Sequence, residues 1–136
     1  PALSLAPVIG ETLAALGAKA VRKSVDRVMD RSRLGPSFPA REAHLLRIAC
    51  RKARYMAEFF TEILGQPVAR LARRMKAVQD VLGDIHDCDI CLAHLRRAVA
   101  LAPPGLFAEL NRRRRAHVAR FGRAWKMLEK ATDRHA

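Results

Sequence analysis

Five residues that carry or can take a positive charge lie within the twelve-residue segment HLLRIACRKARY, residues 44–55. They are His44, Arg47, Arg51, Lys52 and Arg54. The arginine guanidinium group is a planar fork of N–H donors that matches phosphate and carboxylate oxygens, whereas the lysine ammonium group is a point charge. The segment has no glycine or proline. Its residue types therefore predict an ordered element that binds an oxyanion.

The spacing of these cations predicts a stripe along one helix. At about 100° per residue, four of them fall on a narrow arc. We call this arc the basic stripe: His44, Arg47, Arg51 and Arg54. Tyr55 falls at its boundary, and Lys52 falls within the apolar arc that the periodicity predicts as the core face: Leu45, Ile48, Ala49, Met56, Phe59, Phe60 and Ile63. The alternative is a solvated face with intrahelical ion pairs, such as Arg54 with Glu58.

A second basic segment contains RRRR, residues 112–115. In a helix, Arg114 falls within the apolar arc of Leu110, Val118, Phe121, Trp125 and Leu128, with His117 at the edge of that arc. An arginine on an apolar face needs a carboxylate partner, unless it lines a water-filled channel that binds anions. The remaining arginines of this segment point elsewhere, and we expect them to be solvated: Arg112, Arg113, Arg115 and Arg120.

Acidic residues are concentrated in the segment QDVLGDIHDCDIC, residues 79–91. Asp80, Asp84 and Asp87 share one helical face, and we expect them to tether the basic residues of the segment above. Gly83 lies in the middle of this helix, where glycine costs about 1 kcal/mol relative to alanine. Close approach of another backbone would explain it.

The same segment contains residue types that bind metals, His86, Cys88, Asp89 and Cys91, but it lacks the geometry of a metal site. Cys88 and Cys91 are one helical turn apart, while His86 and Cys88 point in nearly opposite directions, so no metal site is predicted. We expect His86 to be a structural residue that is hydrogen-bonded near a helix interface. The sequence contains no glycine-rich phosphate loop, nucleophile elbow or HExxH motif, and it predicts neither an enzyme nor a cofactor. The cysteines are expected to be free thiols.

The overall charge indicates a polyanionic partner. The 136 residues include 26 Lys and Arg against 13 Asp and Glu, which gives a formal net charge of +13. Twenty of the 26 cations are arginine. No apolar run approaches the roughly 18 residues of a membrane span, and no membrane partner is expected. The opening PALSLAPVIG does not read as a signal peptide, and it resembles the edge of a fragment. A cytoplasmic location is the expectation.

Four long helical segments must position these residues. The apolar periodicity predicts helices over residues 5–32, 39–64, 67–101 and 106–131, separated by segments with glycine and proline. Short connections favour antiparallel neighbours, and hence an all-α antiparallel four-helix bundle in a single domain over residues 1–136. The apolar side of the first helix is expected to contain Val8, Ile9, Leu13, Leu16, Val21, Val25 and Val28. The predicted shared core comprises Met56, Phe59, Phe60, Val78, Leu82, Ile85, Phe121 and Trp125.

Two segments resemble those of the CHAD family, the conserved histidine α-helical domain. In HLLRIACRKARYMAEFF the family pattern is matched by His44, Arg47, Arg54, Tyr55 and Glu58. Arg51 stands where the family usually has lysine, and Lys52 where it usually has arginine, which keeps the charge but changes the donor geometry. The second segment is VQDVLGDIHD, residues 78–87. Together with the helix pattern, the resemblance covers most of the chain.

The resemblance implies a fold and a partner. CHAD proteins consist of two four-helix bundles related by a pseudo-twofold axis, and their basic inner surface binds inorganic polyphosphate. Some are fused to triphosphate-tunnel phosphohydrolase domains, and some associate with polyphosphate granules. This chain resembles the C-terminal bundle and lacks the first. The binding surface is then incomplete, or a second copy of the chain completes it as a homodimer.

The expected function is therefore non-catalytic binding of inorganic polyphosphate, in the cytoplasm or at polyphosphate granules. The expected binding residues are His44, Arg47, Arg51, Lys52, Arg54, Tyr55, Arg114 and His117. The expected supporting residues are Glu58, Asp80, Asp84, His86 and Asp87. The alternatives are a non-specific RNA or DNA backbone binder, an accessory domain of an enzyme that processes polyphosphate or triphosphate, and a bundle that binds an acidic protein. Base reading is disfavoured, because aromatic residues make up 5% of the chain and four of them fall on predicted core faces: Phe59, Phe60, Phe121 and Trp125.

Overall fold

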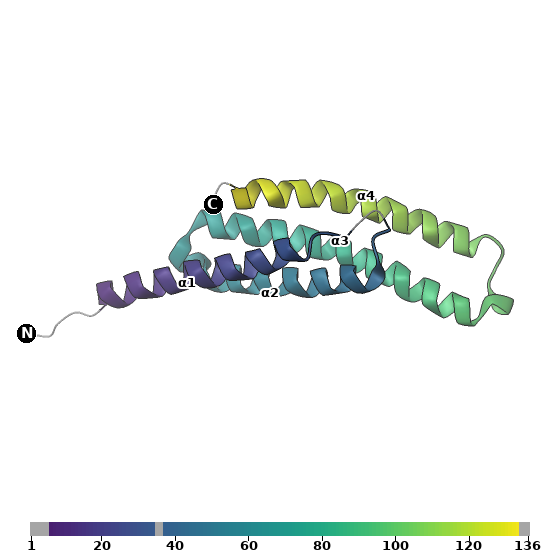
Figure 1. The fold of residues 1–136 in the computed structure, drawn as a ribbon, viewed down its shortest axis with the longest axis horizontal. Coiled ribbons are helices and arrows are strands. Elements are labelled where there is room, and N and C mark those ends of the chain that lie inside the picture. The colour runs from purple at the N-terminus through teal and green to yellow at the C-terminus, as the bar shows by residue number, and fades with distance from the viewer. Residues whose placement is uncertain (1–5, 35–36, 134–136) are drawn as a thin grey trace, which may run out of the picture.

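The computed structural model describes residues 6–34 and 37–133, and every regular element in these residues is helical (Figure 1). The helices are α1 (Ala6–Asp30), α2 (Ala40–Leu64), α3 (Gln66–Arg97) and α4 (Leu106–Asp133). A short 3-10 helix, η1 (Val99–Leu101), follows α3. The prediction of four long helices is confirmed. The third helix ends at Arg97 rather than at residue 101, because Ala98 leaves the helical conformation with φ −124° and ψ 36°.

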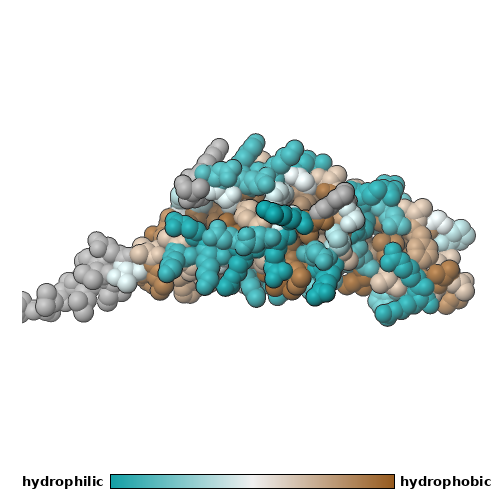
Figure 2. Space-filling view, in the orientation of Figure 1, coloured by the Kyte–Doolittle hydropathy of each residue, from teal (hydrophilic) through white to brown (hydrophobic). Residues whose placement is uncertain are grey.

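Each helix packs mainly against its neighbour in the sequence: α1 against α2, α2 against α3, and α3 against α4. In Figure 1, α3 lies between α2 and α4, and the α3–α4 hairpin extends beyond the other two helices at the η1 end. In Figure 2, hydrophilic side chains cover much of the visible face. No helix among the described residues has the length and apolar character that crossing a membrane would need.

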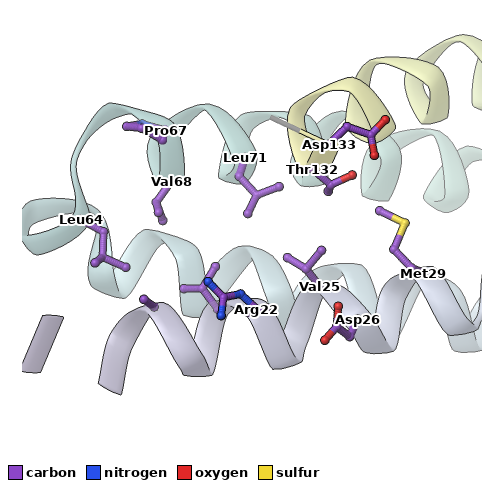
Figure 3. Close-up of a pocket in the computed structure, with 12 residues that line it drawn as sticks. Arg22, Val25, Asp26, Met29, Leu64, Pro67, Val68, Leu71, Thr132 and Asp133 are labelled. Atoms are coloured by element: carbon purple, nitrogen blue, oxygen red, sulfur yellow. The ribbon is translucent and has the colours of Figure 1, made fainter. Parts of the chain in front are cut away.

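The helices leave an apolar hollow of about 450 Å³ between α1 and the ends of α2, α3 and α4 (Figure 3). Its walls include Val21, Val25, Leu64, Val68 and Leu71. Arg22, Asp26 and Asp133 are also among its lining residues. The hollow lies where α1 and α4 do not close against each other.

The core contains most of the residues that the periodicity predicted. Phe60, Val78, Leu82, Ile85 and Phe121 are buried in one cluster, and Met56 and Trp125 pack against it half-buried. Phe59 is the exception, because 76% of it is exposed. Its placement in the core was wrong.

The buried face of α2 is rotated away from the predicted one. It consists mainly of small residues: Ala43, Leu46, Cys50, Ala53, Ala57 and Phe60. Leu45, Ile48 and Ala49 instead line a shallow hollow between α1 and α2, and Ile63 is exposed. Small side chains let two helix backbones approach closely, which suits this face of α2 to helix packing. Leu45 and Ile48 are left beside α1, and Phe59 and Ile63 are left in solvent.

The N-terminal half of α1 also differs from the prediction. Val21 and Val28 are buried and Val25 packs against the core, whereas Leu13 and Leu16 are exposed. The side chains of Val8 and Ile9 lie outside the part of the chain that is described. Gly17 lies under the ring of Phe60, and a Cβ atom at this position would sit 2.5 Å from the Phe60 Cδ1 atom. The glycine therefore allows the buried ring to rest directly on α1.

Candidate anion-binding surface

The antiparallel pairing of α2 and α3 brings the two motif segments into contact. The imidazole rings of His44 and His86 stack, with their centroids 5.0 Å apart and their planes inclined by 25°. One turn farther along, the Arg47 side chain passes over Gly83, with its Nε atom 3.7 Å from the position that a Cβ atom would occupy. The residue that approaches Gly83 is thus an arginine side chain and not a backbone. His86 stacks on the ring of His44 and does not make, within the described residues, the hydrogen bond that was expected from the sequence.

The basic stripe lies beside this α2–α3 seam and is partly shielded from solvent. His44, Arg47 and Arg54 are half-buried, and Arg51 and Lys52 are exposed. The buried Nδ1 of His44 and the buried Nε atoms of Arg47 and Arg54 have no hydrogen-bond partner among the described residues. An unpaired buried polar atom costs about 1–3 kcal/mol. Anion oxygens are acceptors that could satisfy the two arginine donors.

Arg54 makes two weaker contacts at the end of the stripe. Its Nε atom is 3.5 Å from Oε1 of Glu58, which is an ion-pair distance but not a hydrogen bond. Its guanidinium carbon lies 4.7 Å from the centroid of the Tyr55 ring. Glu58 and Tyr55 therefore orient Arg54, but its buried Nε atom still makes no hydrogen bond among the described residues.

The aspartates of α3 do not tether the cations of α2. Asp80 accepts from Lys76 of its own helix at 2.7 Å, and Asp84 accepts from Arg120 of α4 at 3.0 Å. Asp87 is exposed and has no ion pair among the described residues. The tether prediction was wrong, because these carboxylates face solvent and α4. The same NH1 atom of Arg120 lies 2.9 Å from Nδ1 of His117. His117 therefore belongs with the polar side chains between α3 and α4.

Arg114 binds internal partners. Its Nε atom donates to Oδ1 of Asp89 at 2.6 Å, and its NH2 group donates to the carbonyl oxygen of Phe38 at 2.7 Å. The Arg114 and Asp89 side chains are 18% and 16% exposed. Of the two alternatives for this arginine, the carboxylate partner is the one observed. The pair links α4, α3 and the connection before α2.

Sequence reasoning missed both Arg114 partners. Asp89 was weighed only as a metal ligand, although its place on the inner side of α3 was a usable signal. Phe38 has a φ of 47°, which is unusual for a residue with a side chain. Its buried ring packs edge-to-face on Phe121 with the centroids 4.9 Å apart. This packing holds the strained backbone whose carbonyl Arg114 uses.

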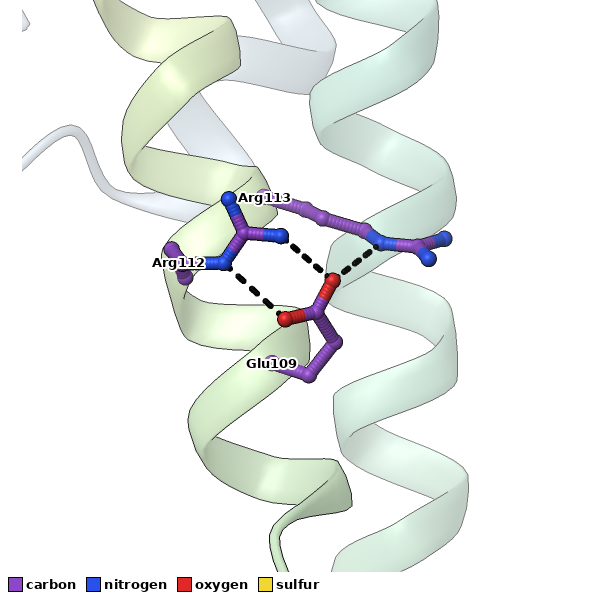
Figure 4. A network of polar contacts seen from close by, with 3 residues as sticks. All are labelled: Glu109, Arg112 and Arg113. Atoms are coloured by element: carbon purple, nitrogen blue, oxygen red, sulfur yellow. Dashed lines mark hydrogen bonds and ion pairs between the residues drawn. The ribbon is translucent and has the colours of Figure 1, made fainter.

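Several side chains away from the basic stripe have shifted pKa values. Two arginines, Arg112 and Arg113, donate to Glu109 and lower the pKa of its carboxyl group to about 2 (Figure 4). The Glu109 hydrogen bond raises the pKa of Arg112 in turn. Both arginines are exposed, as expected from the sequence.

The cysteines are free. Burial raises the pKa of Cys50 to about 12, and burial together with nearby acidic groups raises the pKa of Cys88. Cys91 is exposed. Within the described residues, no three His, Cys, Asp or Glu side chains are grouped closely enough to hold a metal ion.

Comparison with known proteins gives one match. A family model described as CHAD domain matches residues 2–96. The matched range contains α2 with the whole basic stripe and nearly all of α3, while α4 lies outside it. Neither a curated protein nor a solved structure matches the chain significantly.

Proposed function

Because the chain belongs to the CHAD domain family, we propose that it binds inorganic polyphosphate through the basic stripe and catalyses no reaction on it. The observation that carries the proposal is the pair of buried arginine donors without hydrogen-bond partners beside the basic stripe, Nε of Arg47 and Nε of Arg54. Because these atoms have almost no exposed surface, a bound phosphate would have to draw the two side chains outward. Its oxygens would then accept from the donors and remove the cost of leaving them without hydrogen bonds.

The linear arrangement of the stripe supports a linear polyanion over a single phosphate. His44, Arg47, Arg51 and Arg54 follow one another along α2, and at 1.5 Å per residue the stripe spans about 15 Å. Polyphosphate carries one negative charge per unit along its length. The exposed Lys52 adds a cation beside the stripe. Like charges held this close repel one another, so a bound polyanion would relieve repulsion as well as add hydrogen bonds.

The other predicted site residues take supporting roles in this proposal. His86 positions His44 by stacking, and Glu58 positions Arg54. Arg114 holds the bundle together through Asp89 and Phe38, and His117 contacts Arg120 beside Asp84. The proposal therefore rests on the basic stripe and not on these α4 residues. We expect a second copy of the chain to extend the surface, and we expect association with polyphosphate granules in the cytoplasm.

The test compares two double variants that lose equal charge. Arg47→Gln/Arg51→Gln removes two stripe residues, and Arg112→Gln/Arg113→Gln removes two exposed arginines of α4. Each charge-assisted hydrogen bond contributes about 1.5–3 kcal/mol, and about 1.4 kcal/mol is tenfold in affinity. We expect the stripe variant to bind long-chain polyphosphate at least tenfold more weakly than the α4 variant at the same ionic strength. Equal losses would mean that binding depends on net charge alone.

The same titrations address the competing functions. Repeated at several salt concentrations, they should give a steep log–log dependence, because an ionic contact releases counterions. Release of phosphate from tripolyphosphate with Mg²⁺ would overturn the non-catalytic part of the proposal and support an enzyme or an enzyme subunit. Displacement of bound polyphosphate by far less RNA would favour a nucleic-acid backbone binder.

A further inference from the structure

Two aromatic side chains stand exposed, one turn apart, next to the basic stripe. Tyr55 is 53% exposed and Phe59 is 76% exposed. Residues four positions apart lie on the same side of a helix. The sequence pattern had placed Phe59 in the core, and this placement was one of the reasons for disfavouring contacts to bases. The folded chain instead presents an aromatic surface beside its cations.

The Phe59 ring is held in place although it is exposed. It meets the Phe60 ring nearly at a right angle, with the centroids 5.0 Å apart and the planes inclined by 82°. Phe60 is only 6% exposed and rests on Gly17 of α1. A ring anchored through a buried neighbour loses little freedom when a ligand stacks on it, so less binding energy is spent on ordering.

The Tyr55 ring is also part of an ordered contact. The guanidinium carbon of Arg54 lies 4.7 Å from the ring centroid, within the range of a cation–π interaction. Arg54 is half-buried and packed at the α2–α3 seam. Tyr55 nevertheless remains more than half exposed, which leaves ring surface for a ligand. A base stacked there would complete a layered group with the tyrosine and the arginine.

Cations accompany the two rings along the helix. Arg51 and Lys52 are exposed in the turn that precedes Tyr55 and Phe59. Cations that track a phosphate backbone, combined with aromatic rings on which successive bases stack, are the two components of single-strand recognition. The rings are separated by about 6 Å of helix rise. They can therefore receive successive bases of an extended strand, whereas a double helix would keep its bases paired inside.

We propose that Tyr55 and Phe59 form a stacking site for single-stranded nucleic acid, with Arg51 and Lys52 holding the adjacent phosphates. This function goes beyond polyphosphate binding, because polyphosphate has no bases that could stack on the rings. It also differs from backbone-only binding, which uses charge alone. The two functions share cations of α2, so the strand and polyphosphate compete for the same surface.

The first arm of the test changes the rings and keeps the charge. The variant Tyr55→Leu/Phe59→Leu retains apolar side chains and removes the aromatic faces. The probes are a fluorescently labelled 12-nucleotide oligo(dT), an abasic oligonucleotide of equal length, and long-chain polyphosphate. We expect the variant to bind oligo(dT) at least tenfold more weakly than the wild type. Its affinity for polyphosphate and for the abasic strand should fall by a smaller factor, because Tyr55 also orients Arg54. The single variant Phe59→Leu, which keeps the Tyr55–Arg54 contact, should change these two affinities less than twofold.

The second arm keeps aromatic character or alters other apolar residues. The swap Tyr55→Phe/Phe59→Tyr should retain oligo(dT) binding, and the control Leu16→Ala/Ile63→Ala changes two other exposed apolar residues and should also retain it. Equal binding of oligo(dT) by the wild type and the leucine variant overturns the proposal, as does equal binding of the abasic and normal strands by the wild type.

A third readout identifies a protein contact in place of a nucleic acid. If the leucine variant sediments as a smaller species than the wild type while oligo(dT) binding is unchanged, the rings form a self-association surface and the proposal is overturned. The wild type could bind oligo(dT) more tightly than the leucine variant and yet bind no polyphosphate. That result would support the stacking site and overturn the proposed polyphosphate function. The two failures are thus distinguishable.

Discussion

His44 and His86 stack across the α2–α3 seam, with ring centroids 5.0 Å apart. The contact joins the two segments in which this chain resembles the CHAD family. The two histidines are 42 positions apart in the sequence. Their contact also lies one turn from Arg47, whose Nε atom lacks a hydrogen-bond partner among the described residues. The stack therefore fixes the position of His44 at the start of the basic stripe.

The first prediction concerns this ring stack and polyphosphate affinity. His86→Ala removes the ring that positions His44. It should therefore weaken polyphosphate binding, by less than the roughly tenfold expected when two stripe arginines are replaced. His94→Ala, at an exposed position of α3, is the control and should leave the affinity unchanged in titrations at constant ionic strength. Equal affinities of the two variants would show that the stack does not position His44 for binding.

The second prediction concerns the Arg114–Asp89 pair and stability. Asp89→Asn keeps the side-chain shape but removes the charge that accepts from Arg114 at 2.6 Å. Loss of this mostly buried, charge-assisted contact should lower the free energy of unfolding by about 1.5–3 kcal/mol in urea titrations. The matched control is Asp80→Asn, which breaks the exposed pair with Lys76 and should cost about 0–1 kcal/mol. Similar effects of the two changes would show that Arg114 does not hold the bundle together.

The third prediction uses two glycines that respond in opposite directions. A Cβ atom at Gly17 would sit 2.5 Å from the Phe60 ring, so Gly17→Ala must displace a buried side chain. It should lower the free energy of unfolding by about 1–3 kcal/mol. A Cβ atom at Gly83 would lie at ordinary contact distance, 3.7 Å from Nε of Arg47. Gly83→Ala should raise the free energy of unfolding by up to about 1 kcal/mol, because alanine favours the helix. A Gly17→Ala variant as stable as the wild type in thermal unfolding would contradict the Gly17–Phe60 contact, and a destabilised Gly83→Ala variant would contradict the ordinary contact distance at Gly83.

The fourth prediction concerns Glu109, whose carboxylate accepts from two arginines (Figure 4). Its pKa is lowered from 4.5 to about 2, chiefly by the hydrogen bond from Arg112. The stabilising contribution is therefore complete above pH 4.5 and is lost as the pH falls through about 2. Since the group is exposed, its effect on overall stability should be small. An NMR titration of the Glu109 carboxyl carbon should show a midpoint near 2, and Arg112→Gln/Arg113→Gln should move it toward 4.5. A midpoint that stays unchanged in this variant would exclude the arginines as the cause.

The sequence alone determined the four helices and the basic stripe, because both depend on local geometry. Apolar residues at helical spacing, bounded by segments with glycine and proline, were enough to place α2 and α4 to within two residues at each end. The shared side of His44, Arg47, Arg51 and Arg54 follows from the rotation per residue of any α-helix. No knowledge of neighbouring helices is needed for that statement.

The tertiary structure decided which side of each helix is covered and which partner each charge finds. Around α2, one arc carries Ala53 and Ala57 and another carries Phe59 and Ile63, and hydropathy favoured the second. The packed chain buries the first, because small side chains allow a neighbouring helix to approach closely. Arg114 likewise needed a carboxylate, but Asp89 became that carboxylate only through the register of α3 against α4. Packing depends on the shapes of two surfaces at once, and a single helix sequence specifies only one of them.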